Sequence, residues 1–408
     1  MNDVLVADND ALSMTRFSFI TYCLVGWTCF FMPISPSLFS IGLSLLSLLI
    51  VLTPAYRSQA LALFKTSWGA AVSCFFLFAS LACLWGEADW HDKFVVLLKH
   101  SKLLYLPVLA TIFLNRMTRF VGLQALLGGV SVTAVLSILS YVNWVPFLHI
   151  DPDYVFKNHI IMGLMGASGA YIAAYLAIKA KGMVCGLYSA LCLLLGFQVL
   201  WINEGRMGYV LCLFLMGWLS YQYRKNRVVM AFIMSLLLIF TMLYGMSTVR
   251  QARMQKLSYE WHELSNHASP MGVQKATSVG FRVQFYSVAK EMLFTHPIVG
   301  YGTAGFGDYV IKHHLFADWH SGRLREPHSQ YALVGAELGA IGLCLLSWVF
   351  VALFVTIKRG KVLGWMGMGV LIAFCLNQWT DSMLFYSPGY FLILIMAMCL
   401  GEAHENSV

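Results

Sequence analysis

Long apolar runs recur from one end of the chain to the other, and they restrict its possible folds more than any other feature. Several of these runs approach the ~20 residues that an α-helix needs to cross a bilayer. Of the 408 residues, 59% are hydrophobic and 11% are charged, whereas soluble domains carry about 25% charged residues. We therefore predict an all-α polytopic membrane protein, with residues 1–408 forming a single integral-membrane domain.

About twelve apolar runs are predicted to be transmembrane helices. They cover residues 17–33, 37–54, 67–85, 101–115, 120–142, 159–178, 182–201, 208–223, 228–248, 331–357, 362–380 and 387–402. If the N-terminus lies in the cytoplasm, every even-numbered span up to the tenth exits into a basic cytoplasmic connection, as the positive-inside rule requires. The basic residues of these connections are Arg57, Lys65, Arg116, Arg119, Lys179, Lys181, Arg224, Lys225, Arg227, Lys358, Arg359 and Lys361.

The formal net charge of +8 thus comes from short clusters between apolar runs and reflects topology. A nucleic-acid-binding surface would instead gather these charges in one patch or stripe, so no nucleic acid partner is predicted. No metal site is predicted either. All ten cysteines lie in predicted spans, and the loop histidines lack the spacing of a helical metal motif.

One connection is far longer than the others. Residues 249–330 form a polar loop of about eighty residues between spans nine and ten, on the predicted periplasmic side, and long loops of this kind usually carry function. Apolar residues recur within it at helical spacing, which predicts an amphipathic helix at the membrane surface. These residues are Phe281, Phe285, Val288, Met292 and Leu293. The glycine-rich stretch 300–307 then predicts a turn.

The loop ends at a histidine that enters the tenth span. His328 and Ser329 precede that span, and Gly335, Gly339 and Gly342 follow along it. Gly335 and Gly339 are four residues apart, so on a continuous helix they share a face and allow a neighbouring helix to approach closely. His328 is then either an interfacial residue at the start of a span or a reactive group at the water boundary.

The pattern His328-Ser329, nine residues, Gly339-x-x-Gly342 resembles the signature of the O-antigen ligase family. That signature is a His and a small polar residue, nine variable positions and a Gly-x-x-Gly element. The plan of about twelve spans, with one large periplasmic loop just before the motif, is also similar and implies a GT-C-like fold. The sequence-specific part of the resemblance covers about residues 203–209 and 280–342. Oligosaccharide polymerases and protein-glycosylating ligases share the wider superfamily.

Two arginines are candidate phosphate ligands, because a guanidinium is a planar, permanently charged fork that matches phosphate oxygens. Arg206 lies in a tight connection on the predicted periplasmic side, where the positive-inside rule gives no reason for it. The alternative is an interfacial arginine or a partner of Glu204. Arg282 begins the loop helix, and its alternative is an ordinary solvated charge on a polar helix face. The resemblance implies that the arginine at position 206 grips the donor pyrophosphate.

Three other charged residues are weaker candidates. Arg323 and Arg325 precede His328 and either add to a positive field or are ordinary loop charges. Asp381, at the periplasmic end of the eleventh span, either orients His328 or an arginine, or simply meets water. Glu337 lies inside the tenth span, where an acid is costly unless it faces protein or water. We assign it to packing rather than chemistry.

The resemblance implies a glycosyltransferase of the bacterial inner membrane with its active site facing the periplasm and no cofactor. The donor is an undecaprenyl-pyrophosphate-linked glycan, the acceptor is a sugar hydroxyl of the lipid A-core, and the surroundings are membrane lipid. On this hypothesis Arg206 and Arg282 clamp the pyrophosphate, His328 accepts the proton of the acceptor hydroxyl, and direct displacement inverts the anomeric centre. No carboxylate pair that would favour a covalent intermediate is evident in the sequence.

Alternatives remain within and outside this class. The chain could be an O-antigen polymerase or a protein O-oligosaccharyltransferase, although its modest length and the lack of a large C-terminal soluble domain favour lipopolysaccharide ligation. A lipid-linked glycan transporter would be expected to show paired broken helices in two similar halves. The sequence shows neither feature.

Overall fold

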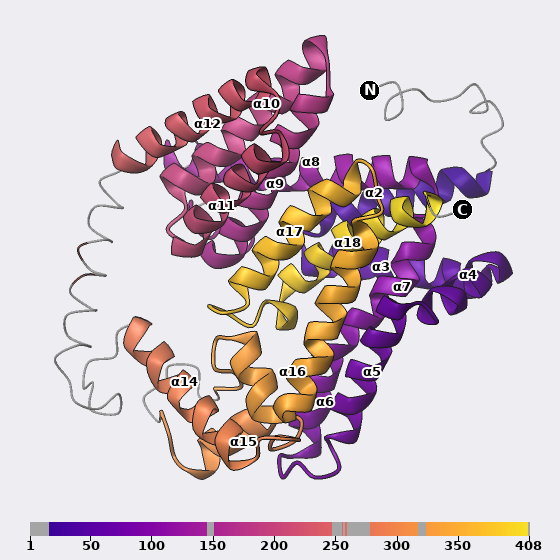
Figure 1. Ribbon diagram of the computed structural model, residues 1–408, viewed down its shortest axis with the longest axis vertical. Coiled ribbons are helices and arrows are strands. Elements are labelled where there is room, and N and C mark those ends of the chain that lie inside the picture. The colour runs from indigo at the N-terminus through magenta and orange to yellow at the C-terminus, as the bar shows by residue number, and fades with distance from the viewer. Residues whose placement is uncertain are drawn as a thin grey trace.

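The computed structural model describes residues 16–144, 151–246, 278–316 and 324–406, together with residues 255 and 258. Within these ranges the secondary structure is helical and includes no strand, so the predicted all-α class is confirmed. The helices gather into an elongated bundle, with α14 and α15 at one end and α10 and α12 near the other (Figure 1). The two described helices of the long polar segment, α14 and α15, therefore lie at one extremity of the molecule.

The first half of the chain forms helices of very different lengths. They are α2 (Arg16–Phe31), α3 (Pro36–Leu52), α4 (Pro54–Phe64), α5 (Ser67–Leu81), α6 (Trp90–His100), η2 (Ser101–Leu104), α7 (Tyr105–Ile112), α8 (Arg116–Tyr141) and α9 (His159–Lys179). Side-chain caps begin several of them. Asn115 accepts from the amide of Met117 at 2.8 Å, and Asn158 accepts from the amide of Ile161 at 2.9 Å. These bonds satisfy amides that have no partner inside the helix.

The second half supplies the remaining helices. They are α10 (Gly182–Phe197), η4 (Gln198–Ile202), α11 (Arg206–Gln222), α12 (Arg227–Met246), α14 (Ser278–Thr295), α15 (Gly305–Lys312), α16 (Gln330–Ile357), α17 (Leu363–Asn377), η6 (Met383–Phe385) and α18 (Ser387–Glu405). The predicted loop helix is thus present as α14. The glycine-rich stretch differs from the prediction, because only its first part is a turn and α15 begins at Gly305.

Each of the twelve predicted spans overlaps a helix, but fewer helices are long and apolar enough to cross a membrane on their own. Among the described residues six pass that test: Trp90–Ile112, Arg116–Tyr141, His159–Lys179, Gly182–Ile202, Gln330–Ile357 and Ser387–Glu405. The pair α3 and α4, bent by 99°, would make a seventh. These helices support a multi-pass membrane protein, whereas the count of twelve and the periplasmic placement of the loop stay predictions.

Two sequence boundaries were wrong. The span predicted at 101–115 begins already at Trp90, since α6, η2 and α7 follow one another without a break. Lys102 therefore lies within a helix, where its ammonium donates to the carbonyl of Phe385 at 2.5 Å. The predicted connection after residue 54 is instead the helix α4, which begins at Pro54. Pro54 disfavours a helical conformation at Thr53 and separates α4 from α3.

The tenth predicted span breaks at Gly339, which has φ 63° and ψ −159°. The segment from Pro297 to Gly302 inserts its backbone at this break. The amides of Ala340 and Ile341 donate to the carbonyls of residues 297 and 298 at 2.8 and 3.2 Å, and the amides of residues 301 and 302 donate to the carbonyls of 336 and 337 at 3.0 and 2.8 Å. The loop therefore supplies hydrogen-bond partners to four backbone groups at the break in α16.

This geometry corrects the proposed role of the glycines. A Cβ on Gly339 would lie 2.4 Å from the carbonyl oxygen of Ile298, so the close neighbour is loop backbone and not a second helix. A Cβ on Gly335 would meet the side chain of Leu293 in α14 at an ordinary 3.5 Å. At Gly342 it would meet Leu338 of the same broken helix at 2.2 Å. The three glycines do not form one helix-packing ridge.

Candidate active site

His328 lies where the long polar segment meets α16, and it is paired with Asp381. Its Nδ1 is 3.2 Å from an Asp381 carboxylate oxygen, and the two side chains are only 26% and 7% exposed. Asp381 follows α17 and also accepts from the amide of Ser382 at 2.9 Å. The sequence prediction that Asp381 orients His328 thus has a direct geometric counterpart.

The backbone around His328 is held from two sides. His328 has φ 52°, a left-handed conformation that costs energy for a residue with a Cβ. Ser329 caps α16 by accepting from the amide of Ala332 at 3.4 Å. The hydroxyl of Tyr286 in α14 donates to the carbonyl of His328 at 3.2 Å and to that of Trp379 at 2.7 Å. The loop helix therefore ties the His328 loop to the turn that carries Asp381.

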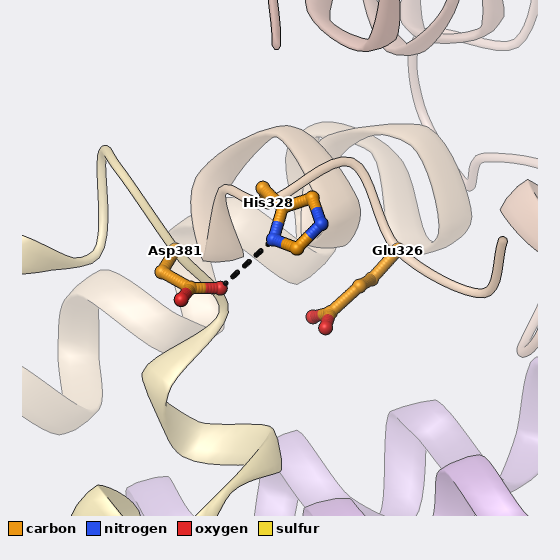
Figure 2. Close-up of side chains that lie close together, drawn as sticks. All are labelled: Glu326, His328 and Asp381. Atoms are coloured by element: carbon orange, nitrogen blue, oxygen red, sulfur yellow. Dashed lines mark hydrogen bonds and ion pairs between the residues drawn. The ribbon is translucent and has the colours of Figure 1, made fainter. Parts of the chain in front are cut away.

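A second carboxylate faces the imidazole from the other side. Figure 2 shows the His328 ring between Asp381 and Glu326. Glu326 is 4% exposed, and one of its oxygens accepts a short hydrogen bond from the hydroxyl of Tyr386. Burial, followed by the negative charge of Asp381, raises the pKa of Glu326 to about 7. At neutral pH this acid is therefore divided between its neutral and charged forms.

The pKa of His328 reflects opposing influences. Burial lowers it, but the hydrogen bond and negative charge of Asp381, together with the charge of Glu326, outweigh burial and leave the pKa above its ordinary value. The positive charge of Arg282 opposes this rise. His328 is consequently a stronger base than an ordinary histidine, and Arg282 is close enough to act on it electrostatically.

Arg206 lies on a different element from the His328 group. It begins α11, directly after a π-helical turn at Gln198–Ile202 and the loop 203–205. Asn203 shapes this loop by donating to the carbonyl of His159 at 2.9 Å and accepting from the amide of Gly205 at 2.7 Å. The amide of Glu204 donates to Asp153 at 2.9 Å. The arginine is thus presented at a helix start by a hydrogen-bonded turn.

The other sequence candidates have structural partners or lie outside the described residues. Arg325 donates to an Asp92 carboxylate oxygen at 2.9 Å, which ties the segment before His328 to α6. Arg323 lies outside the described residues. Glu337 receives a bond of 3.4 Å from the amide of Phe306 near the start of α15. This contact agrees with the packing role assigned to Glu337.

Sequence reasoning missed Glu326. The available signal was its position two residues before His328. Pro327 lies between them, and proline restricts the residue before it to extended conformations, which is compatible with a Glu326 side chain near His328. The structure also corrects the statement that a carboxylate pair is lacking. The ligand atoms of Glu326, His328 and Asp381 all lie within 4.8 Å of one another. Such a group could hold a divalent cation, so the predicted independence from metal needs a direct test.

These features define a multi-pass helical membrane protein in which a histidine lies between two acids and packs against the loop helix α14. Residues 190–347 match the family model described as O-antigen ligase. The match supports membership of the O-antigen ligase/polymerase superfamily and confirms the resemblance found in the sequence. It includes Arg206, Arg282 and His328, whereas Asp381 lies beyond it. No curated protein matches the chain in sequence.

The match supports a ligase or polymerase type of activity, of the kind that a glycosyltransferase carries out. The family description does not identify a donor or an acceptor. The choice of donor and acceptor, and the choice between ligation and polymerisation, depend on the site itself.

Proposed function

We propose that the chain is an O-antigen ligase that transfers a glycan from undecaprenyl pyrophosphate to a sugar hydroxyl of the lipid A-core, on the periplasmic side of the bacterial inner membrane. The observation that carries the proposal is the His328–Asp381 pair, which lies within the electrostatic reach of Arg282. A base beside a permanent cation suits a reaction in which a hydroxyl loses a proton while a diphosphate leaves.

His328 is the proposed general base. A carboxylate can only accept a hydrogen bond, so the neutral imidazole donates its Nδ1 proton to Asp381 and keeps a lone pair on Nε2. Nε2 then takes the proton of the acceptor hydroxyl as that oxygen bonds to the anomeric carbon. The bond from this carbon to the diphosphate breaks, and its electron pair leaves with the diphosphate. A single displacement of this kind inverts the anomeric configuration.

The arginines are the proposed ligands of the leaving group. A guanidinium is a permanently charged group whose paired N–H donors match phosphate oxygens, and Arg282 and Arg206 each supply one. Arg282 lies on α14, the helix that Tyr286 links to the His328 loop, so movement of α14 would move Arg282 with it. The approach of Arg206 to the same diphosphate is part of the proposal, as is the contribution of Arg325 to the local positive field.

Glu326 has a proposed electrostatic role. With a pKa of about 7 it is partly neutral at physiological pH, which limits the negative charge next to a diphosphate. Glu326 already accepts a hydrogen bond from Tyr386, and Asp381 is already engaged by His328 and the amide of Ser382. The pair is therefore assigned to tuning of His328, and direct displacement is retained as the mechanism.

The decisive experiment supplies purified polyprenyl-pyrophosphate glycan and rough lipopolysaccharide to the purified protein, without ATP. Wild type and His328→Ala are compared at equal protein, each with and without EDTA. Glycan-bearing lipopolysaccharide made by wild type in EDTA, and lost in His328→Ala, is the expected result. Loss of wild-type activity in EDTA that returns with a divalent cation would instead assign a metal to Glu326, His328 and Asp381.

The same reaction distinguishes the alternatives. Elongation of the lipid-linked glycan without transfer to lipopolysaccharide would assign a polymerase, and transfer to an added acceptor protein would assign a protein O-oligosaccharyltransferase. No transfer in the reaction, together with glycolipid translocation in vesicles, would refute the enzymatic assignment.

A further inference from the structure

A cavity of about 270 Å³ lies among the ends of several helices, on elements other than those that carry His328. It is bordered by the start of α8, the end of α9, the connection between α16 and α17, and the end of α18. Its wall combines apolar side chains, such as Phe120 and Leu123, with four basic residues and two acids. The proposed topology puts these basic residues at the cytoplasmic surface of the membrane.

The two acids of this cavity already have partners. Glu405 forms an ion pair with Arg119, whose guanidinium also donates to the carbonyls of residues 113 and 114 at 3.0 and 2.9 Å. Glu402 accepts from the amides of Val362 and Gly364, each at 3.0 Å. These contacts hold the ends of α8, α17 and α18 together. They also leave the cavity with positive charge that the acids do not balance.

Three basic residues of the cavity, other than Arg119, are positioned where they could contact an anionic ligand. The lining has a formal charge of +2, because it contains four basic residues and two acids. The basic residues are Arg116, Arg119, Lys179 and Lys361, and the acids are Glu402 and Glu405. Arg116 and Lys361 are exposed, and they stand on separate elements at the border of the cavity. Lys179 is half-buried, with its ammonium 5.8 Å from the centre of the Tyr175 ring. A ligand that carries one or two negative charges would complete this arrangement.

The apolar part of the wall indicates what kind of anion fits. Phe120, Leu123, Leu176 and Leu363 line the same space as the cations. Tyr188 adds a polar group whose hydroxyl donates to Gln124 at 3.0 Å. The volume is slightly below the roughly 300–1,000 Å³ of most ligand pockets, which excludes a whole glycolipid. It suits a phosphate and glycerol group with acyl chains continuing into the membrane.

We propose that this cavity binds the phosphodiester headgroup of an anionic glycerophospholipid, with Arg116 and Lys361 contacting the phosphate. Basic pockets between membrane helices on the cytoplasmic side are a common way to recognise acidic lipid headgroups. A free phosphate ion shares the anionic chemistry but not the acyl chains, so the apolar wall favours the lipid. The site does not depend on the proposed transferase activity.

The test measures retained lipid by native mass spectrometry of the full chain, with phosphatidylglycerol, phosphatidylethanolamine or inorganic phosphate as the probe. The variant is Arg116→Gln with Lys361→Gln. The matched control is Lys225→Gln with Arg227→Gln, which removes the same charge from two exposed residues on the same predicted side. If each cation that contacts the phosphate contributes roughly fivefold in binding, the variant should lose about 30-fold in phosphatidylglycerol affinity. The control removes no phosphate contact and should stay within a fewfold of wild type.

Other outcomes would overturn the proposal. Equal loss in the variant and the control would show attraction by bulk charge, and equal retention of phosphatidylethanolamine would show that the headgroup charge is not recognised. Displacement of phosphatidylglycerol by millimolar phosphate would assign an anion site without lipid selectivity. A photoreactive phosphatidylglycerol should also crosslink to peptides that contain residues 116–124 or 361–363, and exclusive crosslinking elsewhere would place the lipid outside this cavity.

Discussion

Replacement of Asp381 by asparagine tests the candidate site most directly, because it changes one charge and almost no volume. Asp381 is 7% exposed and lies 3.2 Å from His328 Nδ1, so solvent screens the interaction little. Asparagine can present either its carbonyl or its amide to the ring. The second arrangement would stabilise the tautomer that carries its proton on Nε2, which cannot accept a proton from the acceptor.

The expected loss follows from the strength of that bond. A hydrogen bond to a charged group contributes about 1.5–3 kcal/mol, which corresponds to a fall in kcat of roughly 10- to 160-fold. Removing the base itself by His328→Ala should cost more, roughly 100- to 10,000-fold. The order of the two variants is therefore part of the prediction.

The pH dependence adds a second readout with a definite sign. Asp381 raises the pKa of His328, and a base is active when it is neutral. Activity of wild type should therefore increase with pH through a pKa above the ordinary histidine value. Asp381→Asn should lower that pKa and move the acid limb of the kcat profile to lower pH, even though the plateau falls.

The assay is the transfer reaction at saturating donor and acceptor, from pH 5 to 9, with folding checked by size-exclusion chromatography. The control is Asp308→Asn, which breaks the 2.8 Å pair with Lys312 in α15 and should change kcat by less than about fivefold, since such surface pairs contribute about 0–1 kcal/mol. A folded Asp381→Asn protein with wild-type kcat and an unmoved acid limb would refute the assignment of Asp381 and His328 as a catalytic pair.

Three further predictions concern Glu326, Arg282 and Gly339. Glu326→Gln removes a negative charge that raises the pKa of His328. The acid limb of the kcat profile should therefore move to lower pH, while the plateau kcat stays within about threefold of wild type. A loss of kcat as large as that of His328→Ala would instead make Glu326 essential. Arg282→Gln should reduce kcat/KM for the donor roughly 10- to 160-fold. Arg282→Lys should recover only part of the lost kcat/KM, because lysine lacks the bidentate fork. Full recovery by lysine would show that charge alone suffices. Gly339→Ala should destabilise the fold by about 1–3 kcal/mol from backbone strain alone, seen as a lower unfolding temperature, whereas Gly335→Ala, whose added Cβ would lie 3.5 Å from its nearest neighbour, should be nearly neutral.

Much of the architecture could be predicted from local patterns. Apolar runs near bilayer length predicted helices that the structure contains, because a backbone in lipid must satisfy its hydrogen bonds within the segment. The spacing of Phe281, Phe285 and Val288 predicted α14 for the same local reason, since one face of a helix must be apolar to pack. Boundaries were less certain, as the early start at Trp90 and the helix after Thr53 show.

The candidate site was predictable only in part. His328 and Arg282 could be identified from one short region, because their motif and their helix lie close together in the sequence. Asp381 could be named as an acid at a helix end, but its contact with His328 joins residues 53 positions apart. Glu326 was missed because its burial, and hence its raised pKa, comes from packing against Tyr386 and the Asp381 turn.

Gly339 illustrates the difference between what local sequence patterns predict and what depends on tertiary contacts. The spacing of the glycines after His328, and the apolar character of the chain around them, can be read from the amino-acid sequence alone. The helix break at Gly339 depends on tertiary contacts, because hydrogen bonds with a loop some forty residues earlier stabilise the break and the positive φ of Gly339. Local spacing fixes which residues can share a helix face, whereas the partners that satisfy a broken helix, or that shift the pKa of a buried acid, come from distant segments brought together by folding.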